Sequence, residues 1–278
     1  MKQKLYVSGY WPIAGNVKRS GAHYSNWFPQ TLQMLRGADL IFYSSSEDVL
    51  EWAQRLCVAQ GVKMLPRIRA LDEMQAWPLA GQLVQSCERM ALDSWGRPSS
   101  FAGEKGMVHY WRDLRGAGAD VFRCLNTIWL CRTDLLAQES VQAPDHVERL
   151  AWIDSTMARF NGQRSNWRFW MNAEPMDRVS HYASPMRFYG RRLAYNGSYV
   201  SAPRSIWPEF AQLMHQVGNQ AAQMAYGHDD ETIVNECVRQ RPELFHCLGL
   251  PYKRLSRWHF LKAKVKDGLI GYHPKARF

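Results

Sequence analysis

Two spacings of apolar and polar positions alternate over the first part of the chain, and each spacing predicts a different element. Helical spacing runs over 27–35 and again over 49–57, where Ser45 is the expected cap and Gly61 the expected end. Short apolar runs that predict buried strands stand at 5–9, 39–44 and 62–66. This order of strands and helices predicts an α/β fold with a mostly parallel sheet covered by helices.

The rest of the chain is predicted to continue with helices and strands in a less regular order. Residues 72–107 show no clear spacing, and the glycines and serines near 93–106 predict a loop over the site. A long helix is expected through 121–136, and Pro144 ends it. Further elements are expected at 150–154 (a short strand ending in Asp154), 193–202 (a strand or hairpin) and 205–217 (a helix with Ser205 as cap and Pro208 in its first turn).

Length and composition favour a well-packed chain. It has 278 residues, of which 46% are hydrophobic, so it can build a large core and is not expected to be disordered. The chain also holds 12 Trp and 12 Tyr, more than a minimal core needs. Some of these aromatic side chains are therefore expected to line a ligand surface.

The charge balance of the chain is strongly basic, with a formal net charge of +10. Such a balance indicates an anionic partner, for example a nucleotide, a phosphorylated glycan, a nucleic acid or a lipid surface, although it also suits a solubilising surface. Basic residues gather in the tail at 253–278 and, mixed with aromatic residues, at 160–187. These two segments keep a non-catalytic nucleic-acid-binding module open as an alternative.

The cysteines indicate the cellular compartment, and the absence of several motifs counts against some enzyme classes. The six cysteines form no Cys-x-x-Cys pair, and several stand on apolar helix faces, as buried thiols in a reducing compartment do. No run approaches the roughly 20 apolar residues of a membrane span, and no signal peptide is evident, so we expect a cytoplasmic protein, free or peripheral to the inner membrane. The absence of Gly-x-Gly-x-x-Gly, P-loop and Gly-x-Ser-x-Gly motifs counts against dehydrogenases, kinases and hydrolases.

Acidic residues gather at two expected element ends. Residues 228–231 precede a helical pattern at 233–238, where the acids can act as an ordinary N-cap or face a substrate. Asp154 ends a buried strand, where open α/β sheets bind ligands, although it can equally cap a turn. Together with Asp229 and Asp230 it could hold one Mn²⁺ or Mg²⁺ ion, since these cations prefer oxygen ligands and substrate phosphates.

Several short motifs resemble a known family. They are Trp152-Ile-Asp154, Tyr195-Asn-Gly-Ser-Tyr-Val, Ile206-Trp-Pro-Glu-Phe, Asp229-Asp-Glu-Thr-Ile-Val and Arg241-Pro-Glu-Leu-Phe. With these motifs, residues 149–154 and 195–245 resemble the bacterial HtrL/YibB-type proteins. More distantly, they resemble the nucleotide-diphospho-sugar glycosyltransferases of the GT-A fold.

The resemblance implies a GT-A-like, Rossmann-like fold, a nucleotide-sugar donor and a divalent metal ion. It implies that Asp154 holds the metal, with His259 as the better candidate for a second ligand. The family's Asp-x-Asp pattern has Trp152 in place of its first acid here, which leaves metal-independent transfer open. We expect one domain over the whole chain, with a nucleotide-sugar-binding half at 1–150 and a catalytic and acceptor half at 151–278.

Roles for further residues follow from the chemistry of such a transfer. Asp229 or Asp230 is expected to act as the general base, or as the group that faces the anomeric carbon. Gly197 is expected to leave room beside the sugar. The other residues expected to bind the donor are Ser8, Gly9, Tyr10, Lys18, Arg19 and Trp152.

The acceptor is open between two classes. The resemblance implies a hydroxyl group of an anionic bacterial surface glycan. The basic charge and the aromatic-basic segment at 160–187 would also suit DNA with a hydroxymethylated base, because such a base must leave the stack and be held by aromatic side chains. A protein without transfer activity, in which the transferase fold serves only as a scaffold, also stays open, since the first acid of the metal motif is missing.

Overall fold

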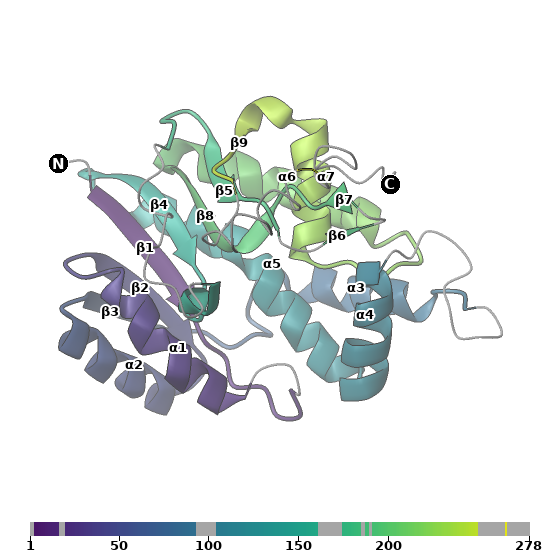
Figure 1. Cartoon of the computed structure of the whole chain (residues 1–278), viewed down its shortest axis with the longest axis horizontal. Helices are drawn as coiled ribbons and strands as arrows, with labels where there is room; N and C mark the ends of the chain where they lie inside the picture. Colours follow the sequence, from purple (N-terminus) through teal and green to yellow (C-terminus); the bar gives the residue numbers. More distant parts are fainter. Residues whose placement is uncertain are drawn as a thin grey trace.

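The computed structural model describes residues 3–16, 20–92, 104–160, 174–184, 187–188, 191–249 and 265. Within this part of the chain a mixed β-sheet carries helices on both faces (Figure 1). The predicted α/β class, with a mostly parallel, helix-covered sheet, is therefore confirmed. Most of the loop expected near 93–106 lies outside the described residues, and its last part is helical instead.

The main sheet of the described residues has seven strands. They are β1 (Gln3–Gly9), β2 (Asp39–Ser44), β3 (Lys63–Ile68), β4 (Val147–Ile153), β5 (Val179–Tyr182), β8 (Asn196–Pro203) and β9 (Phe245–Cys247). Their order across the sheet is β3-β2-β1-β4-β8-β5-β9. The pairs from β3 to β4 are parallel, β8 is antiparallel to both β4 and β5, and β9 is parallel to β5. A separate hairpin pairs β6 (Arg187–Phe188) with β7 (Arg191–Arg192).

Helices connect the strands. They are α1 (Gly21–Gln33), α2 (Glu47–Gln60), α3 (Trp77–Glu88), α4 (Glu104–Val108), α5 (Ala119–Gln142), α6 (Trp207–Ala221) and α7 (Asp230–Gln240). A π-helical segment, η1 (His109–Arg115), continues α4, and 3-10 turns form η2 (Met157–Phe160), η3 (Arg204–Ile206) and η4 (Pro242–Leu244). Figure 1 shows the long helix α5 near the centre of the molecule. No helix in the described ranges is both long and apolar enough to cross a membrane.

Side chains of the central strands alternate between two cores, one on each face of the sheet. Ile41 and Tyr43 of β2 join the core that contains α3, α5, α6 and α7, whereas Leu40 and Phe42 join the core that contains α1 and α2. Strand β4 divides its side chains in the same way. Because successive side chains of a strand point to opposite faces, the continuous apolar runs in the sequence are those of strands buried on both sides.

Two of the predicted helix starts were wrong. In α2, Ser46 and not Ser45 caps the helix, so the prediction missed by one residue. In α6, Ser205 is not the cap: it lies in the 3-10 turn that leads into the helix, and Ile206 occupies the cap position without a side-chain hydrogen bond. Pro208 stands in the first turn of α6, as predicted.

The strand order reverses at β1. Strands β2 and β3 lie on one side of β1, and β4, the next strand along the chain, lies on its other side. At such a switch point the chain leaves the carboxyl ends of two neighbouring strands in opposite directions, which opens a crevice. A ligand site is therefore expected where β1 and β4 end, at Gly9 and Ile153.

Candidate functional site

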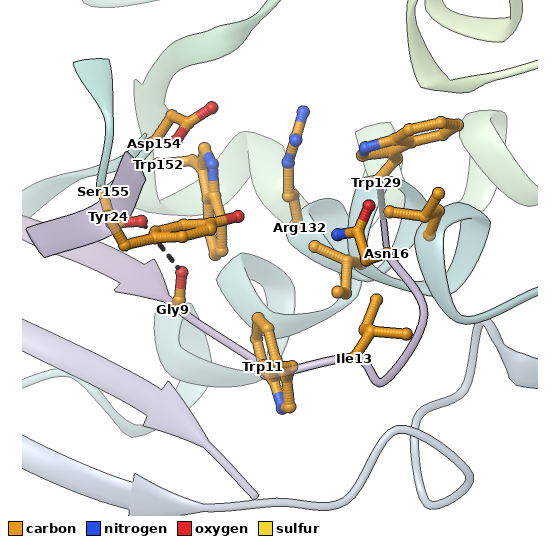
Figure 2. A pocket seen from close by; sticks show the side chains of 12 residues that line it. Gly9, Trp11, Ile13, Asn16, Tyr24, Trp129, Arg132, Trp152, Asp154 and Ser155 are labelled. Atoms are coloured by element: carbon orange, nitrogen blue, oxygen red, sulfur yellow. Dashed lines mark hydrogen bonds between the residues drawn. The ribbon is translucent and has the colours of Figure 1, made fainter. Parts of the chain in front are cut away.

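A pocket occupies this crevice at the carboxyl ends of β1 and β4. Its cavity volume is about 30 Å³, and it lies in a hollow with about 480 Å³ of empty space that is partly open to solvent. Residues from the end of β1, the loop after it, α1, α5 and the end of β4 line it (Figure 2). They include Gly9, Trp11, Tyr24, Arg132, Trp152 and Asp154.

Gly9 lines the pocket at the end of β1. Its carbonyl oxygen accepts a hydrogen bond from Ser155 Oγ at 3.3 Å, which joins the ends of the two strands (Figure 2). A Cβ atom at this position would lie 2.5 Å from the indole ring of Trp11. The glycine therefore allows this ring to pack over the end of the strand.

Two other residues predicted to bind the donor, Ser8 and Tyr10, flank Gly9 but do not line the pocket. Ser8 is buried, and its hydroxyl group donates to the carbonyl oxygen of Ile153 at 2.6 Å. Tyr10 stacks on Tyr24, with 3.9 Å between the ring centroids. Ser8 thus ties β1 to β4, and Tyr10 supports a ring that does line the pocket.

Asp154 lines the pocket directly after β4, but its carboxylate already has protein partners. Oδ1 accepts hydrogen bonds from the backbone N and from Oγ1 of Thr156, both at 2.9 Å. Oδ2 accepts one from Arg159 Nη1 at 3.0 Å. These are the contacts of a turn cap, and the guanidinium group stands where a cation would bind. In the described part of the chain no group of three or more His, Cys, Asp or Glu could hold a metal ion. His259, the other predicted ligand, lies outside this part, so the metal role of Asp154 stays a prediction.

Three further predicted residues lie outside the described part of the chain. Lys18 and Arg19 were predicted to meet the phosphates of the donor, and His259 was predicted as a metal ligand. Their roles stay predictions. Most of the aromatic-basic segment and of the basic tail also falls outside the described residues.

Arg132 of α5 was not predicted, and it reaches the pocket from the helix layer. The residue is 7% exposed, and the two hydrogen bonds that it donates to described residues both use Nη1. One goes to the carbonyl oxygen of Gly197 at 2.7 Å and the other to Asp230 Oδ2 at 2.5 Å. Its Nε is buried without a hydrogen-bond partner among the described residues. A permanent positive charge therefore stands in the wall of the pocket.

Gly197 leaves room for the ion pair between Arg132 and Asp230. A Cβ atom on Gly197 would lie 2.1 Å from Asp230 Oδ2 and 2.2 Å from Arg132 Nη1. The space that we predicted beside a sugar is therefore occupied by these two side chains. The backbone N of Gly197 also faces Glu231 Oε1, at 3.3 Å, so the start of β8 is tied to the start of α7.

Asp229 caps α7, which is one of the two roles considered for it. Its Oδ1 accepts from the backbone N of Thr232 at 2.9 Å, and Thr232 Oγ1 accepts from the backbone N of Asp229 at 3.0 Å. Its Oδ2 lies 2.6 Å from Lys105 Nζ and 3.1 Å from His109 Nε2. Burial alone would raise the pKa of Asp229, but Lys105 and His109 hold it well below its ordinary value. Asp229 is thus an ionised cap whose oxygens have protein partners.

Asp230 differs from its neighbour in both partner and protonation. Burial raises the pKa of Asp230 to about 6, with Arg132 acting against burial and with Asp229 and Glu231 adding to it. A carboxyl group whose pKa lies near neutrality can both take up and release a proton at working pH. Asp230 does not line the pocket itself, but it touches Arg132, which does.

A buried polar network that was not predicted ties α4 and η1 to the start of α7. Lys105 Nζ lies 2.6 Å from Asp229 Oδ2 and 2.7 Å from Glu231 Oε2. His109 stands between Asp113, at 2.7 Å, and Asp229, at 3.1 Å. Burial opposes the charge on Lys105, but the two carboxylates raise its pKa above the ordinary value. The network therefore fixes the direction of the acids at the helix start.

One of the missed residues carries a signal in the sequence. Arg132 stands on the apolar face of α5, between Ile128 and Leu135, at a position where helical spacing calls for an apolar residue. A charge at such a position needs a buried partner, and that need points to function or to an ion pair. Lys105 gave no comparable signal, because it lies in the stretch at 72–107 without clear spacing. His109 follows this stretch, before the helix expected at 121–136.

Comparisons with known proteins give little sequence similarity. No protein-family model matches the chain, and no curated protein matches it. Among solved structures, the chain is similar to mouse xyloside xylosyltransferase 1 in its apo form, with a TM-score of 0.45 and 12% identity. The match covers 98% of this chain and 95% of that chain. A likeness at this level of identity concerns the arrangement of helices and strands and says nothing of the substrate.

Proposed function

We propose that the chain is a glycosyltransferase that binds a nucleotide-diphosphate sugar at the pocket and transfers the sugar to a hydroxyl acceptor. The observation that carries the proposal is the position of the pocket, at the switch point between β1 and β4, where open α/β sheets bind nucleotides. Its wall combines aromatic rings with a guanidinium group, which suits a base or sugar together with a phosphate. The motifs at 149–154 and 195–245 support the same class of reaction.

The donor is larger than the pocket. A cavity of about 30 Å³ takes about two water molecules or a group of similar bulk. A phosphate group at the bottom of the pocket therefore leaves the nucleoside in the surrounding hollow. We propose that donor binding displaces part of the wall at 11–16, which follows β1 and contributes three lining residues.

The two predicted acids would have separate roles in the transfer. The acceptor oxygen forms a bond to the anomeric carbon, while the bond from that carbon to the diphosphate oxygen breaks and the diphosphate leaves with the electron pair. The proton of the acceptor hydroxyl group needs a base. We propose Asp230 for this role, because its pKa of about 6 suits proton uptake. Asp229 would hold the helix start, and Lys18 and Arg19 would contact the phosphates.

A panel of nucleotide-diphosphate sugars, with and without Mn²⁺, tests this function. We expect one nucleotide class to raise the unfolding temperature, since a ligand at about 100 times its Kd adds about 2.7 kcal/mol of stability. The matching sugar donor should release its nucleoside diphosphate faster when a hydroxyl acceptor is present. No thermal shift and no release with any donor would overturn the proposal in favour of a scaffold.

Substitution should separate Asp229 from Asp230. Asp230→Asn is expected to lower kcat by about 10²–10⁴-fold, the usual loss when a general base is removed. Asp229→Asn is expected instead to lower the free energy of unfolding by about 3 kcal/mol, because asparagine keeps the cap but removes the buried charge that pairs with Lys105. Steady-state kinetics and urea unfolding of both variants give the comparison. Full activity of Asp230→Asn would exclude it as the base and leave Glu231 and Glu174 as the next candidates.

For the acceptor we propose an anionic surface glycan, because a net charge of +10 favours an anionic partner. DNA with a hydroxymethylated base is the other candidate on the same observation. Titration with duplex DNA over a salt series separates them: a protein that neutralises several phosphates shows log K falling steeply and linearly with log salt. We expect weak binding without this slope, and sugar transfer to hydroxymethylated DNA would reverse the order of the two candidates.

A further inference from the structure

Two buried N–H donors in the wall of the pocket have no hydrogen-bond partner in the described part of the chain. They are Arg132 Nε and Trp152 Nε1, on residues that are 7% and 2% exposed. The guanidinium carbon of Arg132 lies 5.6 Å from the centre of the Trp152 ring, and both residues line the same cavity (Figure 2). Buried donors almost always have an acceptor, so this pair calls for one.

An unpartnered indole N–H is not enough to indicate a ligand. The Nε1 atom of Trp207 is also buried without a partner among the described residues, yet Trp207 packs in the core at the start of α6 and does not line this pocket. Trp152 differs because a second unpartnered donor, on a cation, stands beside it. Both residues also line a cavity with room for a group of a few atoms.

The charges in the wall favour an anionic acceptor. Among the described lining residues, Arg132 is the one cation and Asp154 the one carboxylate. The carboxylate of Asp154 is neutralised by Arg159 and capped by Thr156. Arg132 is paired with Asp230 through Nη1, and its Nε has no hydrogen-bond partner among the described residues.

We propose that Arg132 Nε and Trp152 Nε1 together bind an anionic oxygen group, a phosphate or diphosphate, and that the guanidinium group supplies the countercharge in place of a metal ion. The identity of the ligand as the diphosphate of a nucleotide rests on the proposed function. The anion site rests on the two donors and the cavity. It follows that a diphosphate binds to this chain in the absence of divalent cations.

Calorimetric titration of the full chain with inorganic pyrophosphate in EDTA tests the site. Wild type should bind. Trp152→Phe keeps most of the ring but removes the N–H, and it should weaken binding about tenfold, as expected for one hydrogen bond to a charged group. Arg132→Lys replaces a planar fork by a point charge and should weaken binding by at least about tenfold. If Arg132→Lys does not fold, the affinity of Trp152→Phe for pyrophosphate alone tests the proposal.

Trp207→Phe is the matched control, because it removes a buried, unpartnered indole N–H away from the pocket. Its affinity for pyrophosphate should stay within about twofold of wild type, since distant sites act independently. Unchanged binding by Trp152→Phe would overturn the proposal. So would an equal loss in Trp207→Phe, because the effect would then come from the fold.

Asp154→Asn distinguishes the anion site from a metal site. If Arg132 supplies the countercharge, removing a carboxylate from the wall leaves the affinity for pyrophosphate in EDTA unchanged or raises it. If wild type binds pyrophosphate only with Mn²⁺, and Asp154→Asn abolishes that binding, the metal prediction is correct and our proposal is wrong.

The outcomes also separate this site from the proposed transferase function. Pyrophosphate binding with the expected pattern of variants, but no turnover of any donor, would support the anion site and overturn the transferase. Donor binding and turnover that Trp152→Phe and Arg132→Lys leave unchanged would support the transferase and overturn the anion site.

Discussion

Replacing Gly197 by alanine is expected to lower the free energy of unfolding by about 3 kcal/mol. The added methyl group would overlap Asp230 Oδ2 and Arg132 Nη1, which lie 2.1 Å and 2.2 Å from its position. Both atoms are the ends of side chains, but both are buried and hydrogen-bonded to each other. Moving them breaks a buried ion pair and the hydrogen bond from Arg132 to the carbonyl oxygen of Gly197. Urea unfolding measures the loss.

A double-mutant cycle shows whether the ion pair causes the loss. Combined with Asp230→Ala, Gly197→Ala should cost clearly less than in the wild-type background, because neighbours that share a contact are not additive. Gly21→Ala is the matched control: its Cβ would meet Tyr10 Oη at 3.7 Å, an ordinary contact, and the change should stay within about 1 kcal/mol. Equal costs in the cycle would place the strain elsewhere.

The N-terminal part of the fold was predictable because its signals are local. The apolar runs became β1, β2 and β3, and Gly61 ends α2 with a φ of 70°, a conformation that glycine adopts easily. The far side of the sheet was not predictable in the same way. Strand β8 is antiparallel to β4, and their junction is closed by a hydrogen bond from the backbone N of Asp154 to the carbonyl oxygen of Ser198 at 2.8 Å. Such pairing depends on tertiary contacts that spacing does not report.

Three of the predicted site residues line the candidate pocket, and their roles stay predictions. Gly9, Trp152 and Asp154 were named from expected strand ends and from the motifs, and open α/β sheets bind ligands at such ends. The pairing of Asp154 with Arg159 was not predicted, because it depends on the turn that follows β4. Arg132 was missed although its place on an apolar helix face signals a buried charge, because its partners Gly197 and Asp230 lie far away along the chain.

The adjacent acids Asp229 and Asp230 show why residues of one type cannot be given roles from sequence alone. Asp229 is the N-cap with extended backbone and Asp230 is the first helical residue, so their side chains leave the helix start in different directions. One carboxylate therefore meets Lys105 and His109, and the other meets Arg132. Lys105 and His109 hold the pKa of Asp229 well below its ordinary value, whereas burial raises the pKa of Asp230 to about 6 against the opposing charge of Arg132. The protein thus holds a permanent anion and a titratable carboxyl group side by side.

His228 and Asp230 are expected to affect acid stability in opposite directions. Burial lowers the pKa of His228 to about 3 and raises that of Asp230 to about 6. The contribution of His228 to the free energy of unfolding is fully present above the unfolded pKa of about 6.5. It is lost as the pH falls below that value, by about 1.4 kcal/mol per pH unit. The contribution of Asp230 to the free energy of unfolding is fully present below the unfolded pKa of about 3.9 and is lost as the pH rises through about 6. Between about pH 4 and 6 the two contributions offset each other in wild type.

Replacing His228 by glutamine should therefore expose the contribution of Asp230. We expect the stability of wild type minus that of His228→Gln to fall by about 3 kcal/mol from about pH 7 to about pH 4, because the variant has no buried imidazole to protonate. The difference in the free energy of unfolding between wild type and Asp230→Asn should rise by a similar amount over the same pH range. Urea unfolding followed by tryptophan fluorescence at several pH values gives both differences. Parallel curves for wild type and His228→Gln would contradict a neutral, buried His228, because a histidine with its ordinary pKa in the folded state adds no pH dependence.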